Sequence, residues 1–200
     1  RPVRFNRRMI ELSEDEAYKN RADQQLRLHE YLNEMPVVQV MLDYVEADDV
    51  IAYVCEHKKY EEWNKIIVSS DKDFYQLCGN EDVMIWRPIQ KTFINRLVLT
   101  SKFGVHPNNF ALARAIAGDA SDNLKGVGRV GLKTIAKNFT FLSESKQYEL
   151  EELVEYCESV EKKKVAHNKI IENQKLVENN YAIMQLYNPS ISVLNRKKID

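Results

Sequence analysis

The spacing of apolar residues changes along the chain, and the change comes near residue 100. Before it, short apolar runs at 37–40, 65–69 and 83–86 have the length and the Val and Ile content of strands. Segments at 21–35 and 48–57 instead place apolar residues three or four positions apart, as amphipathic helices do. Strands that alternate with helices predict an α/β fold with a parallel sheet flanked by helices.

After residue 100 the pattern predicts helices only. We expect one helix over 107–117, with Pro107 in its first turn, and a second over 131–139. One or two long, charge-laced helices should follow over 144–180. The run Lys162-Lys163-Lys164 within them is balanced by glutamates, which favours a solvated helical face, with contact to DNA as the alternative.

Composition limits the kinds of partner that the chain can have. Charged residues make up 30% of the 200 positions but the net charge is only −1, so any surface that binds nucleic acid must be local. No stretch approaches 18 consecutive apolar residues, so we expect no membrane-spanning segment. Cys55, Cys78 and Cys157 lie far apart without a CxxC motif, which predicts buried free thiols rather than a zinc site or a disulfide.

Carboxylates occur in three clusters, each at the boundary of a predicted element. The clusters are Glu46, Asp48 and Asp49; Asp71 and Asp73; and Asp119 and Asp122. The first two follow strands, and sites in such sheets lie beyond the carboxyl ends of the strands, so we expect these clusters to converge. Several hard oxygen ligands are what Mg²⁺ or Mn²⁺ requires, and a pair of such ions can hydrolyse a phosphodiester. Any one cluster alone would more simply cap a helix or a turn.

A glycine-rich segment, Gly126-Val127-Gly128-Arg129-Val130-Gly131, follows the last acidic cluster. With the predicted helices on either side, it is typical of a helix–hairpin–helix. Glycine permits the turn and the close approach of another backbone, and the N–H groups that begin the next helix can bind phosphate. Lys125, Arg129 and Lys133 add positive charge. The alternative is a plain turn between helices; a dinucleotide site is not expected, because no strand of a βαβ unit leads into the glycines.

These motifs, in this order, resemble those of the 5′-nuclease or flap endonuclease family. The family includes phage 5′–3′ exonucleases, phage ribonucleases H and the 5′-nuclease domain of bacterial DNA polymerase I. Tyr44–Val50 is similar to the family's YEADD segment, and Ile67–Leu77 to its TADKDLYQL segment. Ala117–Thr134 is similar to GDxSDNxxGVxGIGxKTA. The resemblance runs from about residue 36 to residue 140.

The resemblance implies a PIN-like 5′-nuclease fold followed by a helical subdomain with a helix–hairpin–helix (H3TH) motif. Residues 1–35 would be a remnant of the arch or clamp, with the basic segment Arg1–Arg8 over a single-stranded 5′ arm. Residues 36–100 would be part of the α/β nuclease core, and residues 101–200 the helical subdomain that binds DNA.

The resemblance also implies roles for individual residues. Of two Mg²⁺ or Mn²⁺ ions, the first would be held by Glu46, Asp48 and Asp49, with Asp48 as a bridge between the ions. The second would be held by Asp71, Asp73, Asp119 and Asp122. The hairpin would hold a K⁺ through its backbone carbonyls, and two basic residues, Arg114 and Lys133, would contact substrate phosphates. The residues expected to bind DNA are Arg114, Lys125, Gly126, Gly128, Arg129, Gly131, Lys133 and Thr134.

The implied function is that of a 5′–3′ exonuclease or flap endonuclease that removes RNA primers or 5′ flaps during phage-type replication. We expect a monomer in the cytoplasm of a bacterial or phage-infected cell, acting on duplex DNA with a 5′ arm or a nick, with replication proteins as candidate partners. The family's first strand with its DGxN-like Asp, and its second acidic motif, do not occur in the 200 residues. We therefore expect this chain alone to be a weak or inactive nuclease and the intact protein to be active.

Two other functions are compatible with the same residues. One is a non-catalytic helix–hairpin–helix module that grips duplex DNA. The other is a metal-dependent ribonuclease of the PIN type, which shares the carboxylates but does not need the hairpin.

Overall fold

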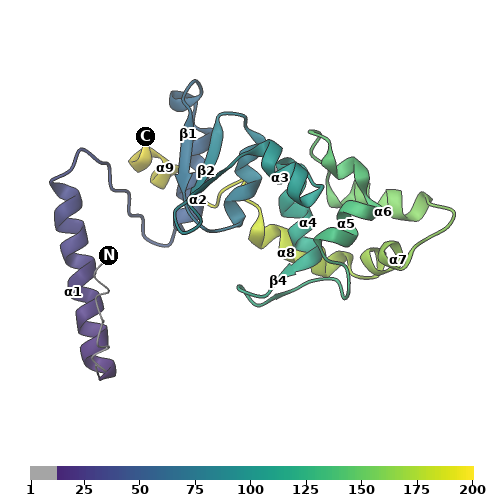
Figure 1. The fold of residues 1–200 in the computed structure, drawn as a ribbon, viewed down its shortest axis with the longest axis horizontal. Coiled ribbons are helices and arrows are strands. Elements are labelled where there is room, and N and C mark those ends of the chain that lie inside the picture. Colours follow the sequence, from purple (N-terminus) through teal and green to yellow (C-terminus); the bar gives the residue numbers. More distant parts are fainter. Residues whose placement is uncertain (1–12) are drawn as a thin grey trace, which may run out of the picture. The chain divides into compact units, whose positions relative to one another are not determined.

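The computed structural model describes residues 13–200, which form two compact units that divide between Met41 and Leu42 (Figure 1). The basic segment Arg1–Arg8 lies outside the described residues. The expected division into an arch remnant (1–35), a nuclease core (36–100) and a helical subdomain (101–200) stays a prediction.

The first unit contains the helix α1 (Glu14–Asn33). Ser13 begins it with a capping box, in which its hydroxyl accepts the backbone N–H of Glu16 and the Glu16 carboxylate accepts the N–H of Ser13. The expected helix at 21–35 is thus present and begins earlier. The strand expected at 37–40 is wrong: this segment is irregular, and its backbone is not part of either sheet that the described residues form.

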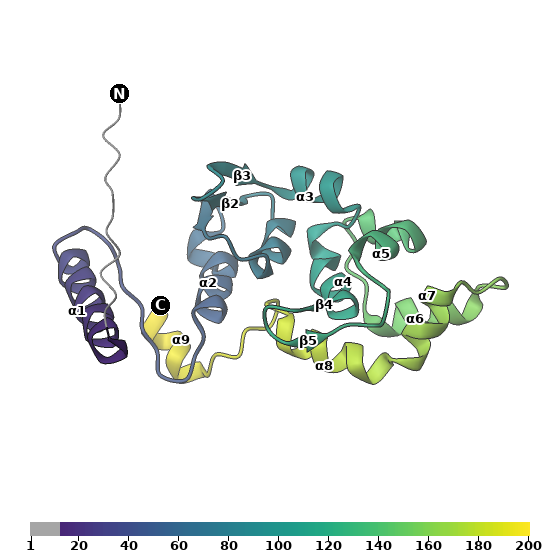
Figure 2. The same ribbon diagram turned by 60° about the horizontal axis from the view of Figure 1, so that its bottom comes forward.

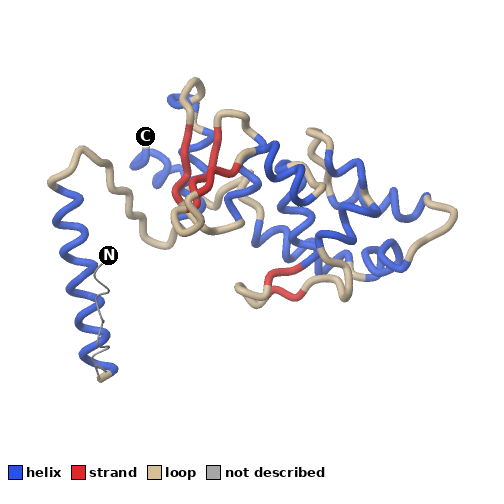
Figure 3. Tube along the Cα trace, in the orientation of Figure 1, coloured by secondary structure: helices blue, strands red, loops and turns tan. Residues whose placement is uncertain are grey.

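The second unit begins with a small mixed sheet, shown in red in Figure 3. β1 (Lys65–Val68) pairs in parallel with β2 (Val83–Arg87), and β3 (Thr92–Ile94) pairs antiparallel with β2. Both predicted strands at 65–69 and 83–86 are confirmed, while β3 makes the sheet mixed rather than wholly parallel. α2 (Ala47–Glu56) confirms the helix expected at 48–57.

Only one face of this sheet is covered by the described residues. Val83 and Ile85 are buried on that face, against the 3₁₀ segment η2 (Asp73–Gly79) and its neighbours. On the other face, Ile66, Val68 and Phe93 are 51%, 66% and 53% exposed. The apolar run at 65–69 is therefore a strand, as expected, but it is not buried on both sides.

The remainder of the unit is mostly helical (Figure 2). The short 3₁₀ helix η1 (Lys58–Tyr60) lies between α2 and β1. After the sheet, the chain forms α3 (Arg96–Phe103), η3 (Pro107–Asn109), α4 (Phe110–Ala117), α5 (Leu132–Asn138) and η4 (Thr140–Ser143). α4 is the centre of this part, since Phe110 through Ile116 are all buried and the helix packs against α8 (Gln174–Met184). None of the helices within residues 13–200 has the length and apolar character that a membrane crossing requires.

The segment expected to hold one or two long helices is divided into three. α6 (Leu150–Ser159) is separated from α7 (Val165–Glu172) by an irregular stretch, and Asn173 separates α7 from α8. The three consecutive lysines, Lys162–Lys164, lie in that stretch and not on a helical face. The chain ends in α9 (Val193–Ile199), beside α2, where the Tyr53 hydroxyl donates to Asp200 (2.8 Å).

A two-stranded hairpin connects α4 to the glycine segment. β4 (Gly118–Asp119) pairs with β5 (Leu124–Lys125), and the backbone at Gly118 passes against that at Gly126. Gly118 has φ +78°, and a Cβ there would lie 2.2 Å from the Gly126 nitrogen. In the turn that follows, the Val130 N–H donates to the Val127 carbonyl, and the positive φ falls on Arg129 (67°) instead of a glycine.

We predict that Gly118→Ala lowers the free energy of unfolding by at least about 2 kcal/mol, because a side chain at positive φ also collides with the facing backbone. Urea denaturation measures this. Gly131→Ala is the control, since a Cβ at Gly131 would meet no atom within 4 Å, and its change should stay within about 0.5 kcal/mol. Equal stability of the two variants would contradict this account of the hairpin.

Candidate metal centre

The first acidic cluster lies where α2 begins. Glu46 is the N-cap residue of the helix, and Asp48 and Asp49 stand in its first turn. Negative charge is favourable there, because the helix N-terminus carries a partial positive charge. The Asp49 carboxylate also accepts the backbone N–H of Ser190 (3.1 Å), which joins it to the C-terminal segment of the chain.

The second cluster follows the carboxyl end of β1. Asp71 accepts the N–H of Asp73 through its Oδ1 (2.9 Å), and the Ser69 hydroxyl accepts the N–H of Asp71 (3.0 Å). These two short-range bonds turn the chain from the strand into η2. They fix the direction of both aspartates at the edge of the sheet where α/β proteins place their sites.

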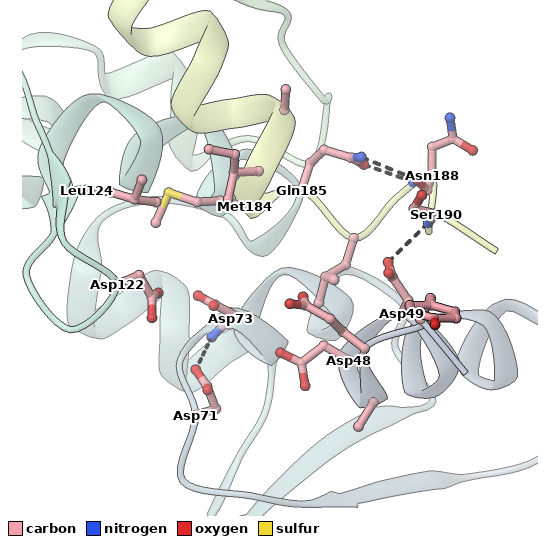
Figure 4. Close-up of a pocket in the computed structure, with 16 residues that line it drawn as sticks. Asp48, Asp49, Asp71, Asp73, Asp122, Leu124, Met184, Gln185, Asn188 and Ser190 are labelled. Carbon is pink, nitrogen blue, oxygen red and sulfur yellow. Dashed lines mark hydrogen bonds between the residues drawn. The ribbon is translucent and has the colours of Figure 1, made fainter. Parts of the chain in front are cut away.

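The clusters converge on one open pocket of about 810 Å³ (Figure 4). Six of the seven predicted carboxylates line it: Glu46, Asp48, Asp49, Asp71, Asp73 and Asp122. Oxygens of Asp48, Asp71 and Asp73 all lie within 4.8 Å of one another. Such a set of hard oxygen donors fits a divalent cation of the Mg²⁺ or Mn²⁺ kind, which takes a few carboxylates and keeps several waters.

Asp119 differs from the other six, since it does not line the pocket. Its Oδ1 accepts the N–H (2.8 Å) and the hydroxyl (2.5 Å) of Ser121, which shapes the tip of the β4–β5 hairpin. Its other oxygen accepts a hydrogen bond from Arg114. Asp122, on the same hairpin, is exposed and faces the pocket (Figure 4).

Arg114 is the residue whose position the sequence did not reveal. It projects from the buried helix α4, its side chain is only 8% exposed, and its two terminal nitrogens donate to Asp73 and Asp119. This place differs from the expectation that Arg114 contacts a substrate phosphate, because the guanidinium is already enclosed between two carboxylates. The one feature of the sequence that points to this contact is that Arg114 stands five residues before Asp119.

The crowding of acids changes their protonation. Burial is the main cause that raises the pKa of Asp48 above its ordinary value of 3.8, and the charges of Asp71 and Glu46 raise it further. Burial likewise raises the pKa of Asp73, although the Arg114 guanidinium beside it acts in the opposite direction. Both carboxyls therefore take up protons more readily than exposed aspartates do.

One wall of the pocket comes from the C-terminal segment 182–190, which the sequence did not single out. Gln76, 3% exposed, attaches this wall to the second cluster. Its side-chain amide donates to the carbonyls of Asp73 and Met184 (both 2.9 Å), and its oxygen accepts the N–H of Leu186 (2.8 Å). A buried amide that satisfies three backbone groups holds the two segments in a fixed relation.

The residues expected to bind DNA, Arg114 apart, lie on the hairpin and the start of α5. Lys125, Gly128, Arg129, Gly131 and Lys133 are exposed, whereas Gly126 and Thr134 are half-buried. α8 supports this segment, because the buried Asn180 donates to the carbonyls of Ala115 and Lys125 (both 2.9 Å). The three cysteines are free and buried, as expected.

Known proteins match both the sequence and the fold. Residues 15–104 match the family model "5'-3' exonuclease, N-terminal resolvase-like domain". A 5'-3' exonuclease of Buchnera aphidicola is 32% identical over 107 residues, covering 54% of this chain and 37% of that protein. The flap endonuclease Xni of Shewanella is 33% identical over 110 residues, covering 55% of this chain and 42% of that protein. The chain thus spans less than half the length of these relatives.

Solved structures of the bacteriophage T5 enzyme have the same fold. One, of the 5'-exonuclease with divalent zinc ions bound, superposes with a TM-score of 0.69 at 19% identity, over 88% of this chain and 64% of that one. Another, of the flap endonuclease with DNA and metal ions, gives a TM-score of 0.68 at 18% identity, over 88% of this chain and 63% of that one. Over residues 15–104 the chain is therefore similar to 5'-3' exonucleases, and it shares the fold of the T5 enzyme.

Proposed function

We propose that this chain forms part of a divalent-metal-dependent 5′ nuclease, which hydrolyses phosphodiester bonds in DNA that carries a single-stranded 5′ arm or a nick. The observation that carries the proposal is the convergence of Asp48, Asp71 and Asp73 within 4.8 Å, from segments that are far apart in the sequence. Three like charges gain nothing for the fold at that distance, and a bound cation would supply the compensation.

The residues of the pocket suggest how the ions are shared. Asp48, Asp71 and Asp73 would hold one Mg²⁺ or Mn²⁺, and Asp122, which lines the same pocket, would help to hold a second. When bound, such an ion would lower the pKa of an attacking water and stabilise negative charge on the phosphate and leaving oxygens. Glu46 and Asp49, at the rim of the same pocket, would orient waters around the ions.

Arg114 acts in this proposal as a positioning residue. Its guanidinium fixes one oxygen of Asp73, so that the carboxylate presents its other oxygen to the pocket, and it keeps Asp119 turned toward the hairpin. The chain thereby couples the acidic pocket to the segment proposed to bind DNA.

Substrate binding would fall to the hairpin and the first turn of α5. Lys125, Arg129 and Lys133 are exposed cations there, and backbone N–H groups at the start of α5 can receive a phosphate. A K⁺ at the hairpin would have to share the Gly128 carbonyl, which already accepts the Lys169 ammonium (2.5 Å). We expect the protein to act as a monomer in the cytoplasm of a bacterial or phage-infected cell, where such DNA occurs.

The direct test replaces one carboxylate by an amide. Asp71→Asn in the intact protein should lower the rate of cleavage of 5′-flapped DNA at least about a hundredfold, because several kcal/mol of metal-dependent stabilisation is lost. The asparagine oxygen can still accept the N–H of Asp73, so the fold and DNA binding should be retained. Cleavage is measured under single-turnover conditions and binding by fluorescence anisotropy.

The matched control is Asp82→Asn, which changes an exposed aspartate outside the pocket and should leave the rate unchanged. Full activity of the Asp71 variant would refute the proposal. Loss of DNA binding together with cleavage would also count against it, since that result indicates a structural role for Asp71.

The affinity for metal should begin to fall at a higher pH than it would if the ligands were ordinary aspartates. Protons compete with the metal for Asp48 and Asp73, whose pKa values are raised above 3.8 by burial. Metal binding should therefore weaken as pH falls toward these raised pKa values. Calorimetric titration of Mn²⁺ at a series of pH values from 8 downward measures it, and an affinity that does not fall along the series would contradict the prediction.

Removing the positioning cation should cost stability. Arg114→Ala leaves Asp73 and Asp119 mostly buried without their partner, which should lower the free energy of unfolding by about 3–5 kcal/mol. Arg114→Lys keeps the positive charge, so it should lower the free energy of unfolding less than Arg114→Ala does. It should still be less stable than the parent, because an ammonium group lacks the planar fork that reaches both carboxylates. Chemical denaturation at pH 7 compares the three proteins; an Arg114→Ala variant as stable as the parent would show that the two ion pairs contribute nothing.

A further inference from the structure

An open groove of about 440 Å³ lies on the helical part of the chain, between η4, the loop that follows it and α6. Three of its lining residues are aromatic and two are carboxylates, and the lining includes no lysine or arginine. The six residues are Phe141, Tyr148, Glu152, Glu155, Tyr156 and Ser159. Aromatic faces and carboxylates both attract cations, so the lining has the chemistry of a cation site.

The acidic side of the groove is one face of α6. Four lining residues have the helical spacing i, i+3, i+4 and i+7, namely Glu152, Glu155, Tyr156 and Ser159. The opposite face of the helix is anchored in the core by Leu153 and Cys157, which are fully buried. α6 contains four glutamates and no lysine or arginine, so like charges on it repel one another, and a cation in the groove would relieve this repulsion.

The aromatic side of the groove is built around Phe141. Its ring centroid lies 4.8 Å from that of Tyr148 and 4.9 Å from that of Tyr156, with interplanar angles of 57° and 67°. The rings are thus tilted and do not cover each other's faces as flat stacking would. Tyr156 is 38% exposed, which leaves part of its ring open to a ligand.

A buried asparagine holds the aromatic side in place. The side chain of Asn109, 0% exposed, donates to the carbonyls of Leu142 (3.1 Å) and Lys146 (2.9 Å), and its oxygen accepts the N–H of Tyr148 (2.9 Å). The loop between η4 and α6 has no helix or strand of its own, so these bonds fix its course. A site that is formed in advance loses less conformational entropy when it binds.

The fold already places one cation against two of the lining residues. The Lys146 ammonium lies 4.4 Å from the centroid of the Tyr148 ring and 2.6 Å from a carboxylate oxygen of Glu152. Within residues 13–200, no lysine or arginine stacks on the ring of Tyr156, and none lies within 4.0 Å of the Glu155 carboxylate. A second ring and a second carboxylate of the same kind are therefore left for a cation from outside.

We propose that this groove binds an arginine side chain that a partner protein presents. A planar guanidinium can stack on a ring and donate to a carboxylate at the same time, so it can use Tyr156 and Glu155 together. Arginine and tyrosine are both enriched at protein interfaces. A nucleic acid does not fit, because Glu152 and Glu155 repel its phosphates.

This inference does not depend on the proposed nuclease function. None of the six residues lines the acidic pocket, so the chain can bind a partner through the groove whatever chemistry that pocket performs.

The test is a titration of this chain with a short glycine peptide that carries two arginines, followed through the NMR shifts of the Phe141, Tyr148 and Tyr156 rings. Such a peptide makes few contacts, so we expect a dissociation constant in the millimolar range. The same peptide with citrulline, which has nearly the shape of arginine without its charge, should bind about tenfold more weakly. A lysine peptide should also bind more weakly than the arginine peptide, because an ammonium group lacks the planar fork.

Glu155→Gln should weaken binding of the arginine peptide about three- to tenfold, since it removes the free carboxylate of the groove. Tyr156→Leu, which keeps every charge, should weaken it by a similar factor. Glu158→Gln is the matched control: it makes the same change of charge at an exposed position of the same helix, outside the groove, and should change the affinity less than about twofold. Glu155 is itself exposed, so its variant retains the fold even if the loss of the Tyr156 ring disturbs the core.

Equal binding of the arginine and citrulline peptides would overturn the inference, because the groove would then not recognise the charge. Equal weakening by Glu155→Gln and Glu158→Gln would also overturn it, because the attraction would belong to the helix as a whole. Spermidine that shifts the same rings as strongly at the same concentration would overturn the assignment to an arginine side chain of a protein.

Discussion

Mutual repulsion among carboxylates is the constraint around which this molecule is organised. Asp48, Asp71 and Asp73 lie within 4.8 Å of one another, a separation at which ionised groups in a partly buried pocket destabilise the fold. The chain offsets this with fixed donors. Arg114 donates to Asp73, and backbone N–H groups donate to Asp71 and, at the rim, to Asp49. Burial, and after it the neighbouring carboxylates, raise the pKa of Asp48, and burial raises that of Asp73 against the effect of Arg114.

Contacts outside the carboxylates bring these distant segments together against that repulsion. The carboxyl end of β1 and the N-terminus of α2 each orient an acidic cluster through ordinary local structure, namely a side-chain turn and a helix dipole. The β4–β5 hairpin brings Asp122 to the opposite side and depends on the close approach of Gly118 and Gly126. Gln76 then joins the C-terminal wall to the second cluster, so that four separate segments form one pocket.

Much of this could be predicted because the responsible signals are local. The runs at 65–69 and 83–86 contain enough β-branched residues to specify strands. Of the seven carboxylates predicted at element boundaries, six line one pocket. The break at Lys162–Lys164 could not be predicted, because charge-rich sequence suits a helix and a solvated loop equally well. The run at 37–40 has strand composition, yet it forms no strand, since pairing depends on a neighbour and not on composition.

The site was harder to predict where it depends on tertiary contacts. Nothing in the sequence near Arg114 shows that its guanidinium turns inward between Asp73 and Asp119, and a basic residue close to a hairpin is more naturally interpreted as a phosphate contact. Gln76 and the segment 182–190 carry no motif, because backbone hydrogen bonds made by a buried amide leave no pattern along the chain.

The central claim is that these carboxylates form a binding site for divalent metal, and it is tested most directly by anomalous diffraction from crystals soaked in Mn²⁺. The account predicts a manganese peak bounded by oxygens of Asp48, Asp71 and Asp73, at coordination distances of about 2.1 Å. A pocket that stays empty at millimolar Mn²⁺, or a peak bound only by acids elsewhere on the surface, would contradict it.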